Sequence, residues 1–255
     1  MAPAPVLLLD QTDSTNAEAR RRAEAGETGP LWIAARRQTA GRGRRGRAWE
    51  SADTGNLFTT LLTTTRKPPA EAAQVTFVAA LAVADLLDRY APPSVVTIKW
   101  PNDVMLAGRK ACGILVESGA HETGGLWLAV GIGVNLAEAP EGTERPAAAL
   151  SHHLSADHLA PPKVERAAED LAGTFAVWMD RWETLGFQPV LDAWAARTPG
   201  LDGPAVARLG HETVEGRAEG VAADGALRLR LADGSLRLIS AGDVFFGPEL
   251  QGGAG

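Results

Sequence analysis

The spacing of the apolar residues changes near residue 200, and this change constrains the fold more than any other feature. Before that point, residues 69–90 and residues 163–185 carry apolar side chains at helical intervals. After it, apolar and polar residues alternate with the period of a half-buried strand. Residues 198–204 contain two prolines and two glycines and are the candidate boundary. We therefore expect two domains, residues 1–200 and residues 203–250.

The segment beyond the boundary has the pattern of a small antiparallel β domain. Leucines alternate with alanine or arginine over residues 226–231, and Leu236 and Leu238 repeat the pattern. Asp-Gly pairs at residues 224–225 and 233–234 lie between the runs and are typical of two-residue hairpin turns. These features predict a barrel-like unit of short strands.

The first domain mixes strands with helices. Thr15 and Glu18 have capping-box spacing, so a helix is expected to begin here, and Gly26 can end it. A further helix is expected at residues 189–196. Apolar runs of strand length lie at residues 6–9, 31–35, 57–64, 95–99, 113–117 and 126–135. This mixture indicates an α+β fold with a mixed or antiparallel sheet and helices on one face.

Residues 36–47 concentrate positive charge in an acidic chain. This run holds six arginines and no acid, although the 255 residues include 31 acidic residues against 25 lysines and arginines, a net charge of −6. The acidic average argues against a protein that coats nucleic acid or an anionic membrane with its whole surface. A local anion site is the favoured interpretation; a solvated basic loop or a nuclear-localisation-like run is the alternative.

The glycines of this run form GRGRRG at residues 41–46, which satisfies the dinucleotide-binding pattern G-x-G-x-x-G. The context does not fit that fold, because the following residues indicate a turn and a strand rather than a helix. No G-x-x-x-x-G-K-[ST] phosphate loop occurs in the chain. We therefore predict a flexible loop over residues 41–47, the arginine loop, whose guanidinium groups bind phosphate oxygens. We expect this loop to be mobile without a ligand.

Two of the four lysines, Lys99 and Lys110, lie in the segment IKWPNDVMLAGRKACGILVES. Because Pro101 cannot lie inside a central strand, we predict that one strand ends before it, that Asn102 and Asp103 form a turn, and that Lys110 begins the next strand. This arrangement brings two ammonium groups and one carboxylate to one hairpin end. An ordinary hairpin, in which Asn102 only makes the turn, is the alternative.

Two further groups of polar residues are candidate ligand contacts. Ser14, Thr15 and Asn16 lie at a predicted helix start, where backbone N–H groups point outward, although helix capping alone would explain Thr15. Asn135 ends the glycine-containing apolar run VGIGVNL, where its carboxamide could contact a purine edge or a ribose.

Other features limit the class of protein. The single cysteine, Cys112, excludes an internal disulfide and a Cys-based zinc site and is compatible with a reducing cytoplasm. No basic segment precedes the first apolar run, so we expect neither a signal peptide nor a membrane span there. His152, His153 and His158 lack a metal-binding pattern and are expected to be loop residues.

In this order the segments resemble the biotin protein ligase family. The matching pieces are DSTN, QTAGRGRRGRAW, KWPNDV, GRKACGILVE and GIGVNL, which begin at residues 13, 38, 99, 108 and 131. The resemblance spans essentially the whole chain and implies a class II synthetase-like catalytic domain followed by an SH3-like β barrel. Family members that are also repressors have an N-terminal helix-turn-helix domain, for which we expect no room ahead of DSTN. Lipoate ligases share the fold but carry a different glycine-rich stretch.

The resemblance implies a two-step reaction. Biotin and ATP form biotinyl-5′-AMP and pyrophosphate, and the biotinyl group then passes to a lysine of a carboxyl carrier domain. Mg²⁺ would enter with ATP, without a cage of protein ligands. Lys110 would bridge the carboxylate and the α-phosphate, Arg42 and Arg44 would close over the phosphates, and Asp103 would assist the incoming lysine or hold Lys110.

The same resemblance implies the other site residues. The expected catalytic residues are Lys110, Arg44 and Asp103. The expected biotin-binding residues are Ser14, Thr15, Asn16, Gln38, Arg42, Gly43, Arg44, Lys110 and Gly113. The expected contacts to ATP or adenylate are Arg42, Arg44, Arg47, Trp49, Lys99, Asn102 and Asn135. We expect a cytoplasmic monomer or weak homodimer that binds neither DNA nor membrane. A nucleic-acid binder and a lipoate or other acyl ligase are the competing hypotheses.

Overall fold

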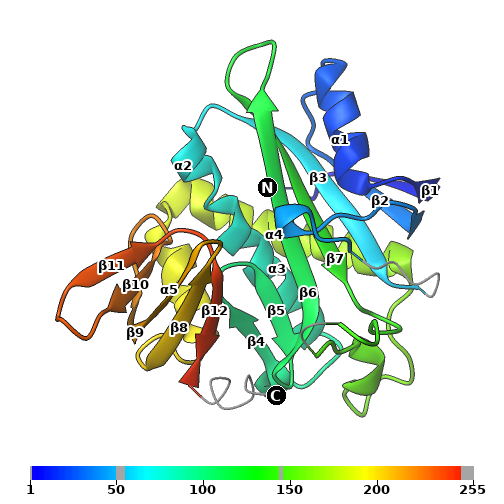
Figure 1. The fold of residues 1–255 in the computed structure, drawn as a ribbon. Coiled ribbons are helices and arrows are strands. Elements are labelled where there is room, and N and C mark those ends of the chain that lie inside the picture. Colours follow the sequence, from blue (N-terminus) through cyan, green and yellow to red (C-terminus); the bar gives the residue numbers. More distant parts are fainter. Residues whose placement is uncertain (1, 50–54, 144–145, 248–255) are drawn as a thin grey trace.

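The computed structural model describes residues 2–49, 55–143 and 146–247, and its larger part is built on one seven-stranded sheet (Figure 1). The strand order is β1-β2-β3-β7-β6-β5-β4. β1 pairs with β2 in parallel, and every other neighbouring pair is antiparallel, so the predicted mixed sheet is confirmed. The strands are β1 (Val6–Thr12), β2 (Leu31–Gln38), β3 (Leu57–Thr65), β4 (Val96–Lys99), β5 (Asp103–Leu106), β6 (Arg109–Ala120) and β7 (Leu126–Val134).

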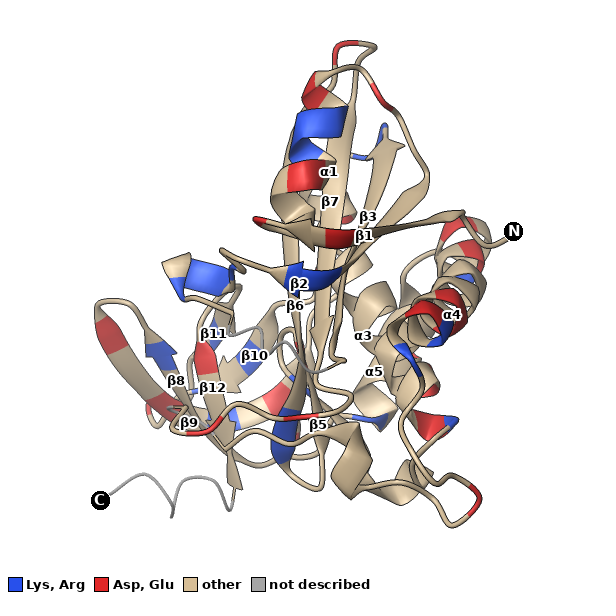
Figure 2. Ribbon diagram, turned by 90° about the vertical axis from the view of Figure 1, so that its right-hand side faces the viewer, with Lys and Arg blue, Asp and Glu red and all other residues tan. Residues whose placement is uncertain are grey.

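Helices cover both faces of this sheet. α3 (Val75–Asp88) and α4 (Val164–Leu185) lie on one face with α5 (Gln188–Ala196) packed against them, as predicted, whereas α1 (Thr15–Glu24) covers the other face. Successive side chains of β2 point to opposite faces of the sheet. Trp32 joins the core under α3 and α4, while its neighbour Ile33 packs beneath α1. Figure 2 shows charged positions on α1 and α4, whereas the central strands β3 and β7 carry none.

The helix expected over residues 69–90 is divided into α2 (Pro69–Ala72) and α3. The stretch Pro69–Asp88 is long and apolar enough to cross a membrane by length and composition. Most of its side chains are instead buried, and the α3 part lies between the sheet and α4, which explains why α3 is predominantly apolar. Asp85, near the end of α3, accepts hydrogen bonds from Trp178 at 2.6 Å and from Arg197 at 2.9 Å.

The predicted capping box at the start of α1 is wrong. Ser14 is the N-cap residue and makes no side-chain capping bond, while Thr15 is the first helical residue. The Glu18 carboxylate binds Arg21 and Arg22 at 2.9 Å rather than the helix start. Thr15 is displaced from capping because its hydroxyl is hydrogen-bonded to Gln38 and Thr60 across the sheet.

The segment beyond residue 203 forms a second, antiparallel sheet of five strands in the order β11-β10-β9-β8-β12. Its strands are β8 (Pro204–Leu209), β9 (Glu212–Val221), β10 (Leu227–Arg230), β11 (Leu236–Ile239) and β12 (Asp243–Phe246). Both Asp-Gly pairs lie in hairpin loops, but these loops are longer than the predicted two-residue turns: Ala222 N–H donates to the Ala226 carbonyl at 2.8 Å, and Leu231 N–H donates to the Ser235 carbonyl at 2.9 Å. Leu227 and Leu229 are buried. Leu236 and Leu238 are exposed because β11 is an edge strand.

The small sheet shares one hydrophobic core with the larger part of the chain. Ala205 and Phe246 belong to the same buried cluster as α3. Trp100, just beyond β4, donates from Nε1 to the Gly225 carbonyl at 3.0 Å. This contact joins the end of β4 to the turn between β9 and β10 in the small sheet (Figure 1), although the domain bounds 1–200 and 203–250 themselves stay predictions.

Candidate functional site

A pocket of about 400 Å³ opens on the α1 face of the large sheet, a volume typical of small-molecule sites. Its wall is formed by the start of α1, strands β3, β6 and β7, the arginine loop, and Asp243 of β12. The sequence-predicted residues that line it are Ser14, Thr15, Asn16, Gln38, Arg42, Gly43, Arg44, Arg47, Trp49, Asn102, Asp103, Lys110, Gly113 and Asn135.

Lys99 is the one predicted site residue that does not line this pocket. It is buried at the end of β4, where its Nζ lies 5.1 Å from the ring centroid of Phe245 in β12. The structure therefore places Lys99 at the junction with the small sheet, and its contact with ATP stays a prediction.

Lys110 points into the pocket because β6 contains a bulge. Val104 of β5 pairs with Cys112, but the next residue, Met105, pairs with Lys110, so Ala111 is the extra residue. Ala111 and Cys112 are consequently both buried in the core under α3. With regular alternation Lys110 would lie on the core face with Cys112; the bulge turns its ammonium to the pocket.

The Lys110 backbone is also hydrogen-bonded to residues 146–148. Its N–H donates to the Pro146 carbonyl at 3.0 Å, and its carbonyl accepts from Ala148 N–H at 2.9 Å. The lysine is thus clamped between β5 and residues 146–148, which limits the positions that Nζ can take.

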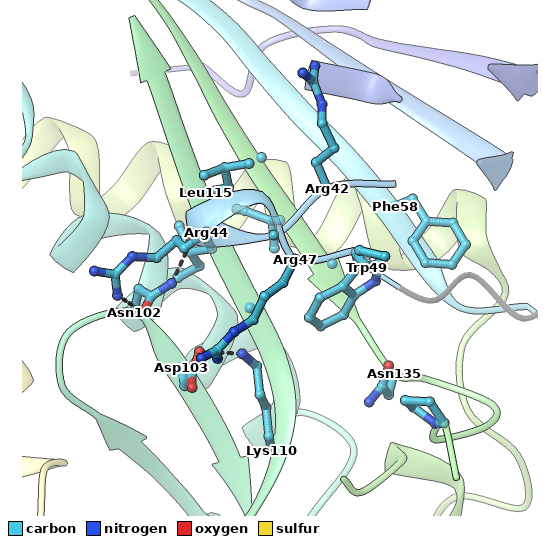
Figure 3. A pocket seen from close by; sticks show the side chains of 18 of the residues that line it. Arg42, Arg44, Arg47, Trp49, Phe58, Asn102, Asp103, Lys110, Leu115 and Asn135 are labelled. Atoms are coloured by element: carbon cyan, nitrogen blue, oxygen red, sulfur yellow. Dashed lines mark hydrogen bonds and ion pairs between the residues drawn. The ribbon is translucent and has the colours of Figure 1, made fainter. Parts of the chain in front are cut away.

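Asp103 lies beside Lys110, with Oδ1 2.7 Å from Nζ (Figure 3). The prediction that Asp103 belongs to a turn is wrong, because it begins β5, a strand that the sequence analysis did not identify. A run of only four residues, DVML, between two turns gives too few alternations to reveal a strand. Pairing with β4 and β6 on either side stabilises it.

The arginine loop folds back on itself between β2 and β3, as its place between two predicted strands indicated. Gly43 N–H donates to the Arg47 carbonyl at 2.8 Å, and Trp49 N–H to the Gly41 carbonyl at 3.0 Å. Arg45 has a φ of 58°, a left-handed conformation that is unfavourable for a residue with a Cβ. The loop is therefore closed by its own backbone and has a strained arginine at its tip.

Arg44 is the arginine of this loop that reaches deepest. Its Nη1 donates to Asn102 Oδ1 at 2.8 Å, and Asn102 Nδ2 donates to the Ile114 carbonyl at 2.6 Å (Figure 3). Burial lowers the pKa of the Arg44 guanidinium, while the charge of Asp103 opposes this effect. Arg44 nevertheless stays charged at neutral pH. Asn102 thus links the loop to β6, and the exposed Arg42 extends away from Lys110.

Asp243 is a pocket residue that sequence reasoning missed. Its Oδ2 lies 3.1 Å from Arg47 Nη2 and 3.4 Å from Arg45 Nη1, so β12 holds the loop. No local signal distinguishes Asp243 from the other acidic residues of the small sheet. Its role follows only from the packing of the two sheets.

Trp49 lies on a platform of two glycines. Gly113 and Gly133 are register partners in β6 and β7, and a Cβ at either position would come within 2.7 or 2.6 Å of the indole ring. The Trp49 ring also lies 5.6 Å from Lys110 Nζ. The i, i+2 spacing of Gly131 and Gly133 on a strand could have revealed a close approach on one face.

The start of α1 forms the other end of the pocket. Ser14, Thr15 and Asn16 are each 4% exposed, so their polar atoms are withdrawn from bulk water. Gln38 Oε1 accepts from the Thr15 backbone N–H at 2.8 Å and lies 3.1 Å from its hydroxyl. These contacts join the end of β2 to the first turn of α1.

Two remaining predictions concern Asn135 and the histidines. Asn135 lines the pocket just beyond β7, where its Nδ2 donates to the Ala148 carbonyl at 3.2 Å. Across residues 2–49, 55–143 and 146–247, no group of three or more His, Cys, Asp or Glu could hold a metal ion. His158 instead packs against Tyr90, with ring centroids 4.9 Å apart.

Comparison with known proteins identifies the family. The model of the biotin/lipoate A/B protein ligase family matches residues 8–135, and that of the biotin protein ligase C terminal domain matches residues 206–247. A biotin–[acetyl-CoA-carboxylase] ligase of Paracoccus denitrificans is 44% identical over 244 residues, covering 94% of this chain and 100% of that protein. The chain belongs to the biotin protein ligase family.

Solved structures of the family have the same fold. A biotin protein ligase of Aquifex aeolicus in complex with biotin and ATP has a TM-score of 0.78 at 22% identity, covering 95% of this chain and 99% of that one. The Leishmania major biotin protein ligase in complex with biotinyl-5-AMP has a TM-score of 0.63 at 23% identity, covering 94% and 100%. The family fold expected from the sequence, catalytic part and C-terminal β unit, is confirmed.

Proposed function

We propose that the chain is an ATP-dependent biotin protein ligase that forms biotinyl-5′-AMP and transfers biotin to a lysine of a carboxyl carrier domain. One observation carries the proposal: a single pocket places the Lys110–Asp103 pair and the arginine loop at one end and buried hydrogen-bonding groups at the other. The Paracoccus relative bears the name of this activity, and the Aquifex protein was solved with both small substrates.

In the first step the biotin carboxylate attacks the α-phosphate. A bond forms between a carboxylate oxygen and phosphorus, and the bond to the β-phosphate oxygen breaks, which releases pyrophosphate. Two anions must approach, so the Lys110 ammonium would sit between them, while Arg44 offsets the charge that builds on the phosphates. Asp103 would hold Lys110 in place through its 2.7 Å contact.

The residues fit magnesium carried by the nucleotide better than a cage of protein ligands. Among the residues that the structure describes, the lining carboxylates are Asp103 and Asp243, and each contacts a lysine or arginine. Mg²⁺ usually keeps waters and binds substrate phosphates. It would therefore enter as MgATP and neutralise the polyphosphate.

In the second step a neutral amine attacks the acyl carbon of the mixed anhydride, and AMP leaves. Asp103 would accept the proton of the incoming lysine, either directly or through water. Trp49, beside Lys110, would pack on the adenine, and Asn135 would contact the nucleotide. The acceptor, a cytoplasmic location and a monomeric or weakly dimeric state belong to this proposal.

The deciding experiment is pyrophosphate release by the purified chain with ATP and biotin, lipoate or octanoate. The proposal expects release with biotin and little with the other two acids. Release with lipoate or octanoate would favour the acyl-ligase hypothesis. A steep salt dependence of binding to nonspecific DNA would favour the nucleic-acid hypothesis, and the ligase proposal expects no such binding.

A further inference from the structure

Glu117 ends the GRKACGILVE segment, yet the proposed reaction does not use it. Gly113 and Leu115 precede it on β6 by four and two positions and line the pocket, so Glu117 lies on the same α1 face. Its Oε2 accepts a hydrogen bond from Asn16 Nδ2 at 2.8 Å. A carboxylate outside the pocket lining therefore contacts a buried amide that belongs to the lining.

The Asn16 amide has partners that determine its orientation. Besides Glu117, its Nδ2 donates to the Leu115 carbonyl at 3.2 Å. Its Oδ1 accepts from the Thr60 hydroxyl, 2.6 Å away on β3, and Thr60 is fully buried. A carbonyl and a carboxylate accept but do not donate, so a flipped amide would lose its bonds to Leu115 and Glu117. Gly131 lacks a Cβ, which would collide with Asn16 Oδ1, and so lets the amide lie on the sheet.

The neighbouring polar groups are oriented in the same way. The Thr15 hydroxyl has one hydrogen, which is used on Gln38 Oε1 at 3.1 Å or on Thr60 Oγ1 at 2.8 Å. Gln38 Oε1 also accepts from the Thr15 backbone at 2.8 Å, so the Nε2 group is the donor that Gln38, a lining residue, has left to offer a ligand. The pocket end thus offers acceptors at Thr15 Oγ1 and Asn16 Oδ1 and a donor at Gln38 Nε2.

We propose that Glu117 and Thr60 are positioning residues that fix the Asn16 amide and thereby select a head group in which N–H donors flank a carbonyl. A cyclic urea has this pattern, whereas a dithiolane ring or a plain alkyl chain has none. The inference rests on the proposed function and assigns recognition of the biotin head group to a network that extends beyond the pocket wall. A ligand without this pattern would leave the buried polar groups of the pocket unpaired, and this cost disfavours its binding.

The first test compares Glu117→Ala with Glu117→Gln. Alanine removes the acceptor, whereas glutamine keeps an oxygen for Asn16 Nδ2 and removes only the charge. We expect Glu117→Ala to weaken biotin binding roughly tenfold, the size of effect typical for one lost hydrogen bond to a charged group. Glu117→Gln should restore most of the affinity. Calorimetry without ATP measures the biotin Kd, and pyrophosphate release gives the KM for biotin and for ATP.

If Glu117 only positions Asn16, its replacement should change the Kd and the KM for biotin and leave the KM for ATP unaltered. The KM for ATP should stay within about twofold of the wild type, a change too small to reflect a lost contact. Glu122→Ala is the matched control, because Glu122 is exposed at the tip of the β6–β7 hairpin. An unchanged biotin Kd in Glu117→Ala, or equal increases in both KM values, would overturn the inference.

Thr60 supplies an independent test if Glu117→Ala folds poorly. Thr60→Val keeps the shape of the side chain but removes the donor to Asn16 Oδ1, and Thr60→Ser retains the hydroxyl. The expected order of biotin affinity is wild type, then Thr60→Ser, then Thr60→Val; equal affinities for serine and valine would contradict the inference. If the wild type releases no pyrophosphate with biotin, the proposed function fails; if it does and these variants bind biotin normally, only the positioning role fails.

Discussion

Asp243 Oδ2 lies 3.1 Å from Arg47 Nη2, although the two residues are 196 positions apart. The contact joins the last strand of the small sheet to the arginine loop, and Asp243 itself lines the pocket. Arg45 approaches the same oxygen at 3.4 Å. The C-terminal unit therefore forms part of the pocket wall.

Replacing Asp243 should loosen the arginine loop. Because the Arg47 side chain is 52% exposed, the pair is partly screened, and we expect only a severalfold faster release of biotinyl-AMP from Asp243→Ala. Release can be followed by trapping the free adenylate with hydroxylamine. In a double-mutant cycle with Arg47→Gln, the coupling energy should be about 1 kcal/mol or less but different from zero. Strictly additive effects would show that the contact does not hold the loop.

Lys110→Ala should abolish adenylate formation while the fold persists. Loss of one preorganised charge from a site of this kind costs roughly 3 kcal/mol, or on the order of 100-fold in rate. Pyrophosphate release with biotin and ATP measures the effect, and circular dichroism checks the fold. Lys67→Ala is the matched control, since Lys67 pairs with Glu71, lies over the Trp182 ring and does not line the pocket. Near-normal release by Lys110→Ala would refute the assignment.

Arg44→Gly should let biotinyl-AMP escape. The variant loses the guanidinium that is held by Asn102 at 2.8 Å, and under the proposed function this is the deepest arginine that would close over the adenylate. We expect faster release and labelling of lysines on added bystander proteins, measured with a streptavidin blot. Arg66→Gly removes an exposed arginine beyond β3 and should not cause labelling. An adenylate residence time equal to that of the wild type would contradict the prediction.

Gly133→Ala should disturb the Trp49 platform. The added Cβ would lie 2.6 Å from the indole ring, so Trp49 must move. We expect a changed tryptophan fluorescence spectrum and weaker ATP binding. Gly173→Ala is the control, because nothing lies within 4 Å of a Cβ there and the residue is within α4. That control should raise the unfolding free energy by about 0.5–1 kcal/mol and leave ATP binding unchanged.

Asp170 should make stability depend on pH. Burial raises the pKa of its carboxyl, but the hydrogen bonds from Tyr90 and Arg166 lower this pKa by more than burial raises it. The pKa of Asp170 therefore lies below the ordinary value of 3.8. Its stabilisation is therefore complete above that value and is lost as the pH falls through the lower folded-state pKa. Asp170→Asn should cost about 1–3 kcal/mol at pH 7.

The measurement for Asp170 is urea unfolding at pH 7 and at pH 3. The difference between the wild type and Asp170→Asn should shrink at the lower pH. Glu169→Gln, an exposed neighbour on α4, should change little at either pH. A difference that is the same at both values would mean that the carboxylate charge is not the source of the stabilisation.

Much of the architecture could be predicted from local pattern. Alternating leucines and Asp-Gly turns placed the small sheet, and apolar spacing placed α4 and α5 to within about a residue, as periodic segments allow. Prediction failed where contacts with residues distant in sequence determine the local structure. Thr15 is hydrogen-bonded to Gln38 and Thr60 rather than capping α1, and β5 is a strand only because β4 and β6 pair with both its edges.

By itself the sequence determined which chemical groups the site contains, because the order of the glycine, arginine and lysine segments is a property of the chain. Only the tertiary structure decided where those groups point. The bulge at Ala111 turns Lys110 to the pocket, Asp243 reaches the arginine loop from the other sheet, and Lys99 lies beside Phe245. Strand register and sheet packing depend on contacts between residues far apart in the chain, and local periodicity does not encode them.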